Sequence, residues 1–461
     1  MFFSAVPPPI ESIFPALGSV TGLKVNELPA PTEKCYDVAF PLSKGKVGSV
    51  EEWDLGALGP DVDVVIRITR QKVYWLFPSF NLPFPTNVDT QIILLKLKNG
   101  RIAALLPLTT NDYMGGFRGS SNESIVPPIG ATSTNALATL ETFAKNGIRP
   151  YSFLIDDAWQ DTKDFRLQSF GCMPSFLDGM NDLGELVKKA KEDFGVKQVG
   201  VWHTIQGYWC GVEPSKFMDK YKLVKVVKDG YPGPFEAEGY EYYIPHPDDV
   251  GRFFDDYYSI IASYGVSYTK VDNMASLDNL VSAKEVLAIE PTESLGPALP
   301  IPSLRIAYKG AIKAAAEKHF GSSEGGRVIW CMGMTPRMIL GAQVGGGSAG
   351  RSVLRNSDDY YPNEPDSHRY HIFINVVNAM FTSQLNLVPD LDMFQSHPYI
   401  RPQGEGNETH TPLQSDIYPQ AAFHAALRSL GAGPVTITDV PGKTDSSILN
   451  KLVGASKAGQ T

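Results

Sequence analysis

The sequence predicts an α/β protein with a (β/α)8 TIM-type barrel that lacks its first strand, preceded by a shortened β-sandwich-like domain. Two observations carry this prediction. Short apolar runs alternate with amphipathic stretches along most of the 461 residues, which is the pattern of buried parallel strands joined by helices. Several of these runs end in carboxylates, and the catalytic groups of such a barrel lie at the C-terminal ends of its strands.

Composition and charge exclude several classes of protein. Hydrophobic residues make up 43% and charged residues 20% of the chain, which is typical of a globular protein. The net charge of −9, without a basic cluster and interleaved aromatics, argues against a nucleic-acid partner. The four cysteines stand at no metal-motif spacing, so we expect no zinc site.

The chain begins Met1-Phe2-Phe3-Ser4 and reaches prolines at 7–9 without a basic segment, so we expect no signal peptide. No apolar stretch of the sequence is long enough to span a bilayer. We therefore expect no membrane partner and a cytoplasmic location.

Two domains are expected. Residues 1–125 are predicted to form an N-terminal β-rich domain, with strands at 62–69, 73–77, 90–97 and 102–106. Residues 126–461 are predicted to form the catalytic barrel. Its predicted strands are 151–155, 199–203, 266–271, 327–332, 352–355, 385–388 and 434–438. Its predicted helices are 131–146, 183–194, 247–264, 304–319, 371–382, 421–430 and 446–452.

A TIM barrel has eight strands, and this pattern supplies seven. The absent strand should precede the helix at 131–146, where only residues 124–126 could pair before Pro127-Pro128 stops the run. The glycine-rich loop at 345–350 lacks the Gly-Lys-Ser/Thr ending of a phosphate loop, so we reject a nucleotide site there.

The run Lys270-Val271-Asp272 ends one predicted strand. Residues two apart in a strand share a face, so Lys270 and Asp272 are expected inside the barrel, near its top. A neighbouring lysine favours the ionised form of a carboxylate, and an ionised, fixed Asp is what a glycosyl nucleophile requires. A structural ion pair at a strand end explains this motif equally well.

Adjacent carboxylates follow two other strands. Asp358 and Asp359 repel each other, which raises at least one carboxyl pKa and suits a general acid. The alternative is an Asx turn in which Asp359 caps the next helix. Asp156 and Asp157 precede Trp159 and suit sugar hydroxyls with a stacking ring, although an N-cap pair beside a core Trp is the favoured reading of that motif alone.

Three more motifs lie at predicted strand ends: Trp202-His203, Trp330-Cys331 and Asp390-Leu391-Asp392. A histidine at such a position is more often a hydrogen-bonded core residue than a base. Each motif is modest by itself, but their joint placement at successive strand ends favours an enzyme that uses paired carboxylates.

Together these motifs resemble the raffinose synthase and seed-imbibition-protein group, relatives of the α-galactosidases of glycoside hydrolase family 36. The matching stretches recur in family order. They are LIDDAWQ from Leu154, GVWHT from Gly200, KVDN from Lys270, RNSDDYYP from Arg355 and PDLDMF from Pro389.

The resemblance implies a glycoside hydrolase or galactosyltransferase that acts on an oligosaccharide α-galactoside with retention of configuration. It implies Asp272 as nucleophile and Asp358 as acid/base, with Asp359 as second choice, and no metal or organic cofactor. The residues implied to bind substrate are Asp156, Asp157, Trp202, Lys270, Arg355, Asp359, Trp330 and Asp392.

The chain departs from the family pattern in several respects. It has no Thr-Trp-Asp/Asn motif before the helix at 131–146, and Leu391 replaces an expected Trp. We also expect the C-terminal β domain of the family to be absent. These departures predict a truncated or internally deleted member with exposed strand edges. A catalytically inactive carbohydrate-binding homologue and a non-functional fragment remain open as alternatives, as does the oligomeric state.

Overall fold

The computed structural model divides the chain into two compact units, the first made of residues 1–125 and 280–286 and the second of the remainder. The structure describes residues 24–28, 35–39, 62–71, 75–80, 90–98, 102–105, 132–228, 240–274, 289–290, 301–321, 327–334, 352–362, 365–382, 387–400, 417–418, 420–431 and 433–452. The segment expected to hold the absent strand (116–128), the glycine-rich loop (345–350) and residues 454–461 lie outside the described residues.

The first unit contains a four-stranded antiparallel sheet in the order β4-β3-β5-β6. Its strands are β3 (Val62–Gln71), β4 (Trp75–Phe80), β5 (Thr90–Leu97) and β6 (Ile102–Leu105). They confirm the four strands predicted from the apolar runs. β1 (Lys24–Leu28) and β2 (Cys35–Ala39) form a further antiparallel pair.

Six parallel strands form the central sheet of the second unit, in the order β7-β10-β13-β15-β16-β17. They are β7 (Ser152–Ile155), β10 (Gln198–Thr204), β13 (Tyr268–Asp272), β15 (Val328–Trp330), β16 (Ser352–Arg355) and β17 (Leu387–Asp390). Each strand pairs with the next one along the chain, so every crossover moves in the same direction. This is the strand order of a barrel and not of a doubly wound sheet. The predicted α/β class is confirmed.

The last predicted strand, β21 (Thr436–Ile437), pairs in parallel with β18 (Met393–Phe394). Because only two residues separate the end of β17 from the start of β18, β21 takes the seventh place in the barrel order. All seven predicted barrel strands are therefore present. Within the described residues β21 does not pair with β7, so the ring of strands is not closed there.

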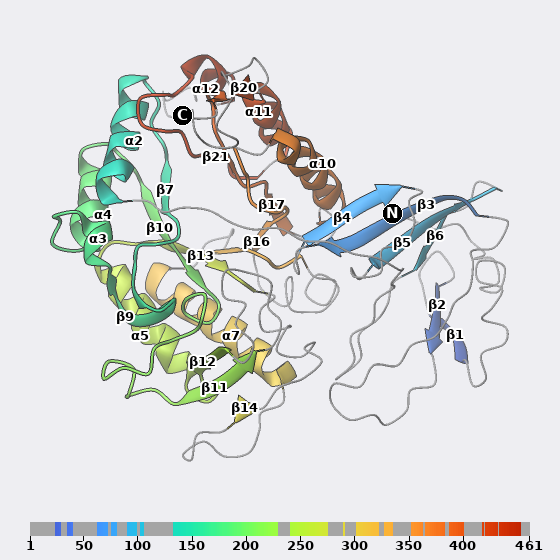
Figure 1. Cartoon of the computed structure of the whole chain (residues 1–461), viewed down its shortest axis with the longest axis horizontal. Helices are drawn as coiled ribbons and strands as arrows, with labels where there is room; N and C mark the ends of the chain where they lie inside the picture. Colours follow the sequence, from blue (N-terminus) through green and yellow to red (C-terminus); the bar gives the residue numbers. More distant parts are fainter. Residues whose placement is uncertain are drawn as a thin grey trace, which may run out of the picture. The chain divides into compact units, whose positions relative to one another are not determined.

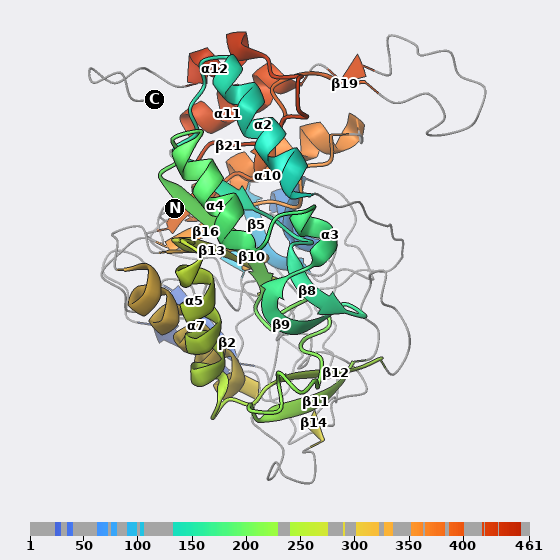
Figure 2. The ribbon, with the colours of Figure 1, turned by 90° about the vertical axis from the view of Figure 1, so that its left-hand side faces the viewer.

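The crossover helices also follow the predicted pattern. They are α2 (Ser133–Lys145), α4 (Leu183–Glu192), α5 (Val250–Ser263), α7 (Ile301–Phe320), α10 (Pro365–Thr382), α11 (Ala421–Leu430) and α12 (Ser446–Leu452). Side-chain caps begin two of them, since Thr132 accepts from the N–H of Asn135 and Asp182 from that of Glu185. Figures 1 and 2 show α2, α4 and α5 on one side of the strands β7, β10 and β13.

The first and last helices of the barrel order meet. Phe143 of α2, Phe394 of β18 and Leu449 of α12 belong to one buried apolar cluster. The N–H of Gly442 also donates to Oγ1 of Thr142, at 2.9 Å. The layer of helices therefore runs continuously across the place where β7 and β21 stay unpaired within the described residues. Burial of these side chains supplies the packing free energy that holds this seam together.

Several elements were not predicted. β8 (Gln160–Lys163) and β9 (Arg166–Cys172) form a hairpin after β7, and β11 (Leu223–Lys228) pairs with β12 (Tyr240–Pro245) after β10. These insertions follow the C-terminal ends of barrel strands, where loops shape the active site in this fold. The remaining short elements are α3 (Pro174–Leu177), β14 (Ile289–Glu290), β19 (Tyr399–Ile400) and β20 (Ile417–Tyr418).

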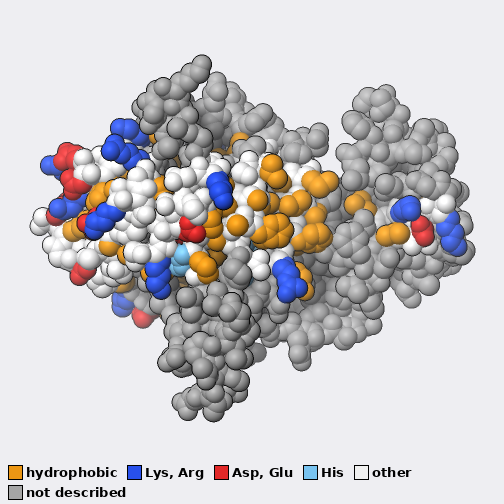
Figure 3. Space-filling model, turned by 90° about the horizontal axis from the view of Figure 1, so that it is seen from above, with side chains coloured by type: hydrophobic (Ala, Val, Ile, Leu, Met, Phe, Trp, Pro, Cys, Tyr) orange, Lys and Arg blue, Asp and Glu red, His pale blue; other side chains and the backbone are white. Residues whose placement is uncertain are grey.

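Apolar side chains are exposed on the outer helices. Tyr370 of α10 is 63% exposed, and Leu430 of α11 is 85% exposed. Figure 3 shows hydrophobic side chains gathered on one part of the face seen from above. Exposed apolar side chains are ordinary on protein surfaces, so they do not by themselves indicate a partner. No helix in the described ranges has the length and apolarity needed to cross a membrane.

Candidate active site

The strand register decides which side chains point into the barrel. Trp202 of β10 lies beside Lys270 of β13, and Thr204 lies beside Asp272. Lys270 reaches Asp156, which follows the end of β7, with Nζ 2.7 Å from Oδ2. Residues in one register row share a face, so β7, β10 and β13 present these side chains on the same inner side. The predicted pairing of Lys270 and Asp272 on one face is confirmed.

Asp272 is the end residue of β13 and is only 7% exposed. Nε1 of Trp202 donates to its Oδ2 at 3.0 Å, and the backbone N–H of Asn273 donates to its Oδ1 at 2.6 Å. Asn273 has a left-handed backbone (φ 57°), which ends the extended conformation of β13 directly after Asp272. Both carboxylate oxygens are therefore hydrogen-bonded in a fixed orientation.

Lys270 stays charged in this buried place. Burial works against its ammonium, but the negative charges of Asp156 and Asp272 raise the pKa of Lys270 well above its usual range. The ion pair with Asp156 is formed on the inner side of the strands, and the Asp156 side chain is 43% exposed. A fixed positive charge thus lies between a buried and an open carboxylate.

Asp157 belongs to the same region through residues that sequence reasoning missed. Nε1 of Trp209 donates to its Oδ2 at 2.8 Å, and the hydroxyl of Tyr208 also bonds it. Burial raises the pKa of Asp157 against the opposing effect of these hydrogen bonds. Trp209 packs 5.3 Å from the ring of Trp202. Its only signal in the sequence was its aromatic type, a few residues beyond the end of a barrel strand.

Two local interpretations are corrected here. The segment after Asp156 and Asp157 enters β8 and not a helix, so these residues are not an N-cap pair. Trp159 was considered as a stacking ring for sugar. It is fully buried, and its indole N–H donates to the carbonyl of Trp202 at 2.7 Å. The expectation that His203 is a core residue is confirmed, because its Nε2 lies 2.8 Å from the hydroxyl of Tyr258.

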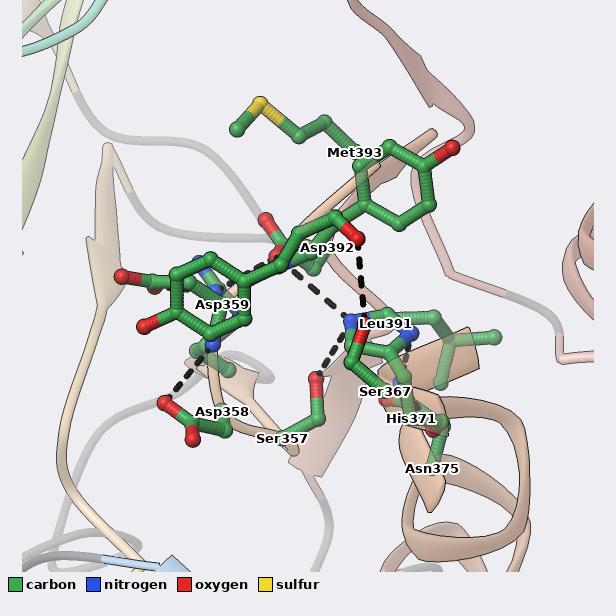
Figure 4. Close-up of polar contacts among 12 residues, drawn as sticks. Ser357, Asp358, Asp359, Ser367, His371, Asn375, Leu391, Asp392 and Met393 are labelled. Atoms are coloured by element: carbon green, nitrogen blue, oxygen red, sulfur yellow. Dashed lines mark hydrogen bonds and ion pairs between the residues drawn. The ribbon is translucent and has the colours of Figure 1, made fainter. Parts of the chain in front are cut away.

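Arg355, the last residue of β16, contacts two carboxylates. Its Nη2 lies 2.7 Å from Oδ1 of Asp359 and 2.6 Å from Oδ2 of Asp392. The Arg355 side chain is 1% exposed, and that of Asp359 is 51% exposed. Asp359 therefore faces open space while its partner is anchored in the interior. Figure 4 shows Asp358, Asp359 and Asp392 among their polar contacts.

Asp359 is the member of the adjacent pair that contacts Arg355. Burial and the negative charges of Asp392, Asp358 and Asp272 raise the pKa of Asp359 to about 6, although the positive charge of Arg355 lowers it. Its open side moderates the burial contribution. Asp358 instead accepts the N–H of Asp359 at 2.9 Å. Because α10 begins at Pro365, neither residue caps that helix, and the N-cap interpretation is wrong.

Two residues predicted to bind substrate lie away from the exposed carboxylates Asp156 and Asp359. Trp330 pairs in register with Val271, whose neighbours Lys270 and Asp272 face inward, so Trp330 lies on the opposite face. There its ring faces Nζ of Lys309 on α7, at 5.8 Å. Asp392 is 4% exposed and lies behind Arg355. Both placements correct the expectation of direct contact with substrate.

Cys331 occupies the inward position next to Trp330. Its Sγ lies 3.9 Å from Nη1 of Arg355, and it is 1% exposed. Burial, followed by the negative charge of Asp272, raises the pKa of the Cys331 thiol well above its usual range. It is thus a small neutral group on the floor between Asp272 and Arg355. The described residues contain no cluster of His, Cys, Asp or Glu suited to a metal ion.

Comparison with known proteins agrees with the motifs. The family described as raffinose synthase or seed imbibition protein Sip1 matches residues 165–457. Among curated proteins, probable galactinol–sucrose galactosyltransferase 1 of Arabidopsis thaliana is 25% identical over 358 residues, which cover 70% of this chain and 42% of the relative. Probable galactinol–sucrose galactosyltransferase 6 of the same plant is 28% identical over 349 residues, which cover 70% of this chain and 40% of the relative.

Two solved structures show the same kind of likeness at low identity. The GH36 α-galactosidase AgaA from Geobacillus stearothermophilus has a TM-score of 0.47 and 12% identity, covering 85% of this chain and 60% of AgaA. The GH27 β-L-arabinopyranosidase Abp from the same organism has a TM-score of 0.40 and 13% identity, and the match covers 69% of this chain and 71% of Abp. Both TM-scores are below 0.5, so the fold assignment rests on the strand order described above.

The chain spans about two fifths of the length of the two curated relatives. The matched range nevertheless covers well over half of this chain, and it includes Lys270, Asp272, Arg355 and Asp359. The family resemblance predicted from the motifs is confirmed: the chain belongs to the raffinose synthase and seed imbibition protein Sip1 family.

Proposed function

We propose that this chain transfers or hydrolyses α-galactosyl groups with retention of configuration, using two aspartates. The observation that carries the proposal is the contrast between two carboxylates. Asp272 is fixed by two N–H donors near the charged Lys270, whereas Asp359 is open to solvent and has a raised pKa. A retaining glycosidase requires one carboxylate that is held in place for nucleophilic attack and a second carboxyl group that can donate and accept a proton.

Asp272 is assigned the role of nucleophile. Its carboxylate attacks the anomeric carbon, the glycosidic C–O bond breaks, and a glycosyl ester of Asp272 forms. Trp202 and the N–H of Asn273 hold the carboxylate oxygens in place during this step. Water or a sugar hydroxyl then displaces Asp272 from the same carbon, which restores the original configuration.

Asp359 is assigned the role of acid/base, in preference to Asp358. In the first step it donates its proton to the departing glycosidic oxygen, and in the second it accepts a proton from water or the acceptor sugar. A pKa raised to about 6 provides the protonated form that the first step requires. The choice of Asp359 is favoured by its contact with Arg355 and its electrostatic interaction with Asp272.

Galactose recognition is assigned to Asp156, Asp157 and their partners. Asp156 and Asp157, with Lys270, Trp202 and Trp209, would hold the sugar hydroxyls and cover one face of the ring. The curated relatives are named as galactinol–sucrose galactosyltransferases. We therefore propose galactinol as donor and sucrose as acceptor, with hydrolysis when water takes the place of sucrose.

The test is turnover of aryl α-galactosides whose leaving groups differ in basicity. Asp272→Asn should abolish turnover of all of them. Asp359→Asn should lose most of its kcat/KM on poor leaving groups and retain kcat/KM on 2,4-dinitrophenyl α-galactoside, whose departure needs no proton, while kcat falls because the second step loses its base. Asp358→Asn is the matched control and should depend on the leaving group as wild type does. Binding of galactose by folded protein without any turnover would support the inactive homologue instead.

A further inference from the structure

One guanidinium nitrogen is shared by two carboxylates of different exposure. Nη2 of Arg355 contacts both Asp359 and Asp392. The Asp359 side chain is 51% exposed and that of Asp392 is 5% exposed. Arg355 itself is almost fully buried, so its charge is divided between an open partner and an inner one. How much of that charge reaches Asp359 depends on how firmly Asp392 holds the guanidinium.

Asp392 contacts two further groups on its buried side, one backbone N–H and one imidazole. The backbone N–H of Tyr360 donates to Oδ2 at 2.7 Å, and Nε2 of His371 lies 3.6 Å from the same oxygen. Ser357 fixes His371 in turn, with Oγ 3.1 Å from Nε2. Figure 4 shows Ser357, His371 and Asp392 in this arrangement. Burial opposes the charge, but Arg355 and His371 hold the pKa of Asp392 well below its usual range.

The backbone around Asp392 is fixed as well. Asp392 adopts a left-handed conformation (φ 63°), which is uncommon outside glycine. Arg428 of α11 donates to the carbonyls of Leu391, Asp392 and Met393, at 2.7, 2.9 and 2.8 Å. These three bonds hold the backbone at and beside the kink between β17 and β18. They also prevent the Asp392 side chain from following Arg355 toward solvent.

We propose that Asp392 is a positioning residue that retains Arg355 on the buried side and thereby sets the proton affinity of Asp359. The inference rests on the proposed role of Asp359 as acid/base. The charged or titratable groups that face Asp359 are Arg355, Asp392, Asp358, Asp272 and Tyr361. Those that face Asp392 are Arg355, His371, Lys270, Arg428, Asp390 and His424.

Neutralising Asp392 should release Arg355 to Asp359. The full positive charge then favours the ionised form of Asp359, so this group loses its proton at lower pH. Asp392→Asn should shift the alkaline limb of kcat/KM for an alkyl α-galactoside down by about one pH unit. The same variant should retain nearly wild-type kcat/KM on 2,4-dinitrophenyl α-galactoside, whose departure needs no acid. Asp392→Glu restores the charge and should bring the limb back toward its wild-type position.

A merely structural role gives a different result. It predicts equal losses on both substrates and an unmoved alkaline limb, and this outcome would overturn the proposal. If Asp392→Asn does not fold, His371→Phe serves as the second variant. That change removes one contact that favours the Asp392 anion, so it should shift the limb in the same direction by a smaller amount. An unmoved limb in a folded His371→Phe would likewise contradict the proposal.

The wild-type profile separates this inference from the proposed function. If wild type turns over the alkyl substrate and Asp359→Asn removes the alkaline limb, the acid/base role stands and Asp392→Asn tests positioning alone. If wild type shows no limb that depends on Asp359, the assignment of the acid fails and the positioning role fails with it.

Discussion

The indole Nε1 of Trp202 donates a 3.0 Å hydrogen bond to Oδ2 of Asp272. Asp272 ends β13, and Trp202 lies two residues before the end of the neighbouring parallel strand β10, on the same inner face. Trp202 is 1% exposed, so its ring cannot turn away without disturbing the core. The bond therefore fixes the orientation of the proposed nucleophile before any substrate arrives.

Trp202→Phe should lower kcat by about 100-fold, because it removes one fixed donor from a group whose charge changes during the reaction. Stopped assays with an aryl α-galactoside measure the effect. Trp209→Phe is the matched control, since it removes the same kind of N–H from Asp157. That variant should raise KM more than it lowers kcat. Equal effects on kcat in both variants would count against separate roles for the two indoles.

Lys270→Met should abolish most activity and leave the protein folded. Methionine has a similar length and removes a buried charge, and such replacements are often nearly neutral for stability. Asp156 is 43% exposed, so water can solvate it when Lys270 is absent. We expect kcat/KM to fall by at least about 100-fold, with Tm within a few degrees of wild type. A large fall in Tm with activity lost only in proportion would identify a structural ion pair instead.

The barrel strands could be predicted from the sequence because strands buried on both faces form continuous apolar runs. The run that became β13 carries the apolar Val271 on one side and Lys270 and Asp272 on the other, and its placement needed only strand periodicity. The hairpin β8–β9 was missed because Gln160-Asp161-Thr162-Lys163 has no apolar alternation. Gln160 is buried because its side chain bonds Gly207 and Tyr257, and those partners are remote in sequence.

For the candidate site, the sequence predicted which residues lie at the ends of strands but not how those residues are oriented relative to one another. Trp330 was expected to bind substrate, but its pairing with Val271 puts it on the opposite face, and no single strand reveals that pairing. The choice between Asp358 and Asp359 depends on the turn that brings one of them to Arg355. The burial of Asp392 follows from a left-handed kink that Arg428 stabilises from a helix about 35 residues later.

Gly433→Ala should destabilise the protein by about 2–4 kcal/mol. A Cβ at this position would overlap the backbone carbonyl of Pro389 in β17, and backbone yields less easily than a side-chain tip. Gly310→Ala is the control, because a Cβ there meets nothing within 4 Å and α7 is helical. It should raise the free energy of unfolding by about 0.5–1 kcal/mol. Urea unfolding of both variants measures these effects, and a loss of stability in both would contradict the steric explanation.

The protein should lose stability as the pH falls below about 6.5, the ordinary pKa of histidine. Burial lowers the pKa of His203 to about 4 and that of His424 to about 2. Between pH 6.5 and 4 the unfolded chain therefore binds protons at these residues that the folded protein excludes. One such proton lowers the free energy of unfolding by about 1.4 kcal/mol per pH unit. Asp359 acts with the opposite sign, because its raised pKa makes the folded protein bind a proton near pH 6.

His203 isolates one part of this effect. Its Nδ1 lies 2.8 Å from the carbonyl of Thr204, so Nε2 accepts from the hydroxyl of Tyr258 when the ring is neutral. His203→Asn removes the titrating group while it keeps a polar side chain. Urea unfolding at pH 7.5, 6.0 and 5.0 should show a shallower loss of stability for His203→Asn than for wild type. Parallel pH dependences for the two proteins would mean that His203 binds its proton equally well in the folded and the unfolded protein. His203 would then contribute nothing to the loss of stability in acid.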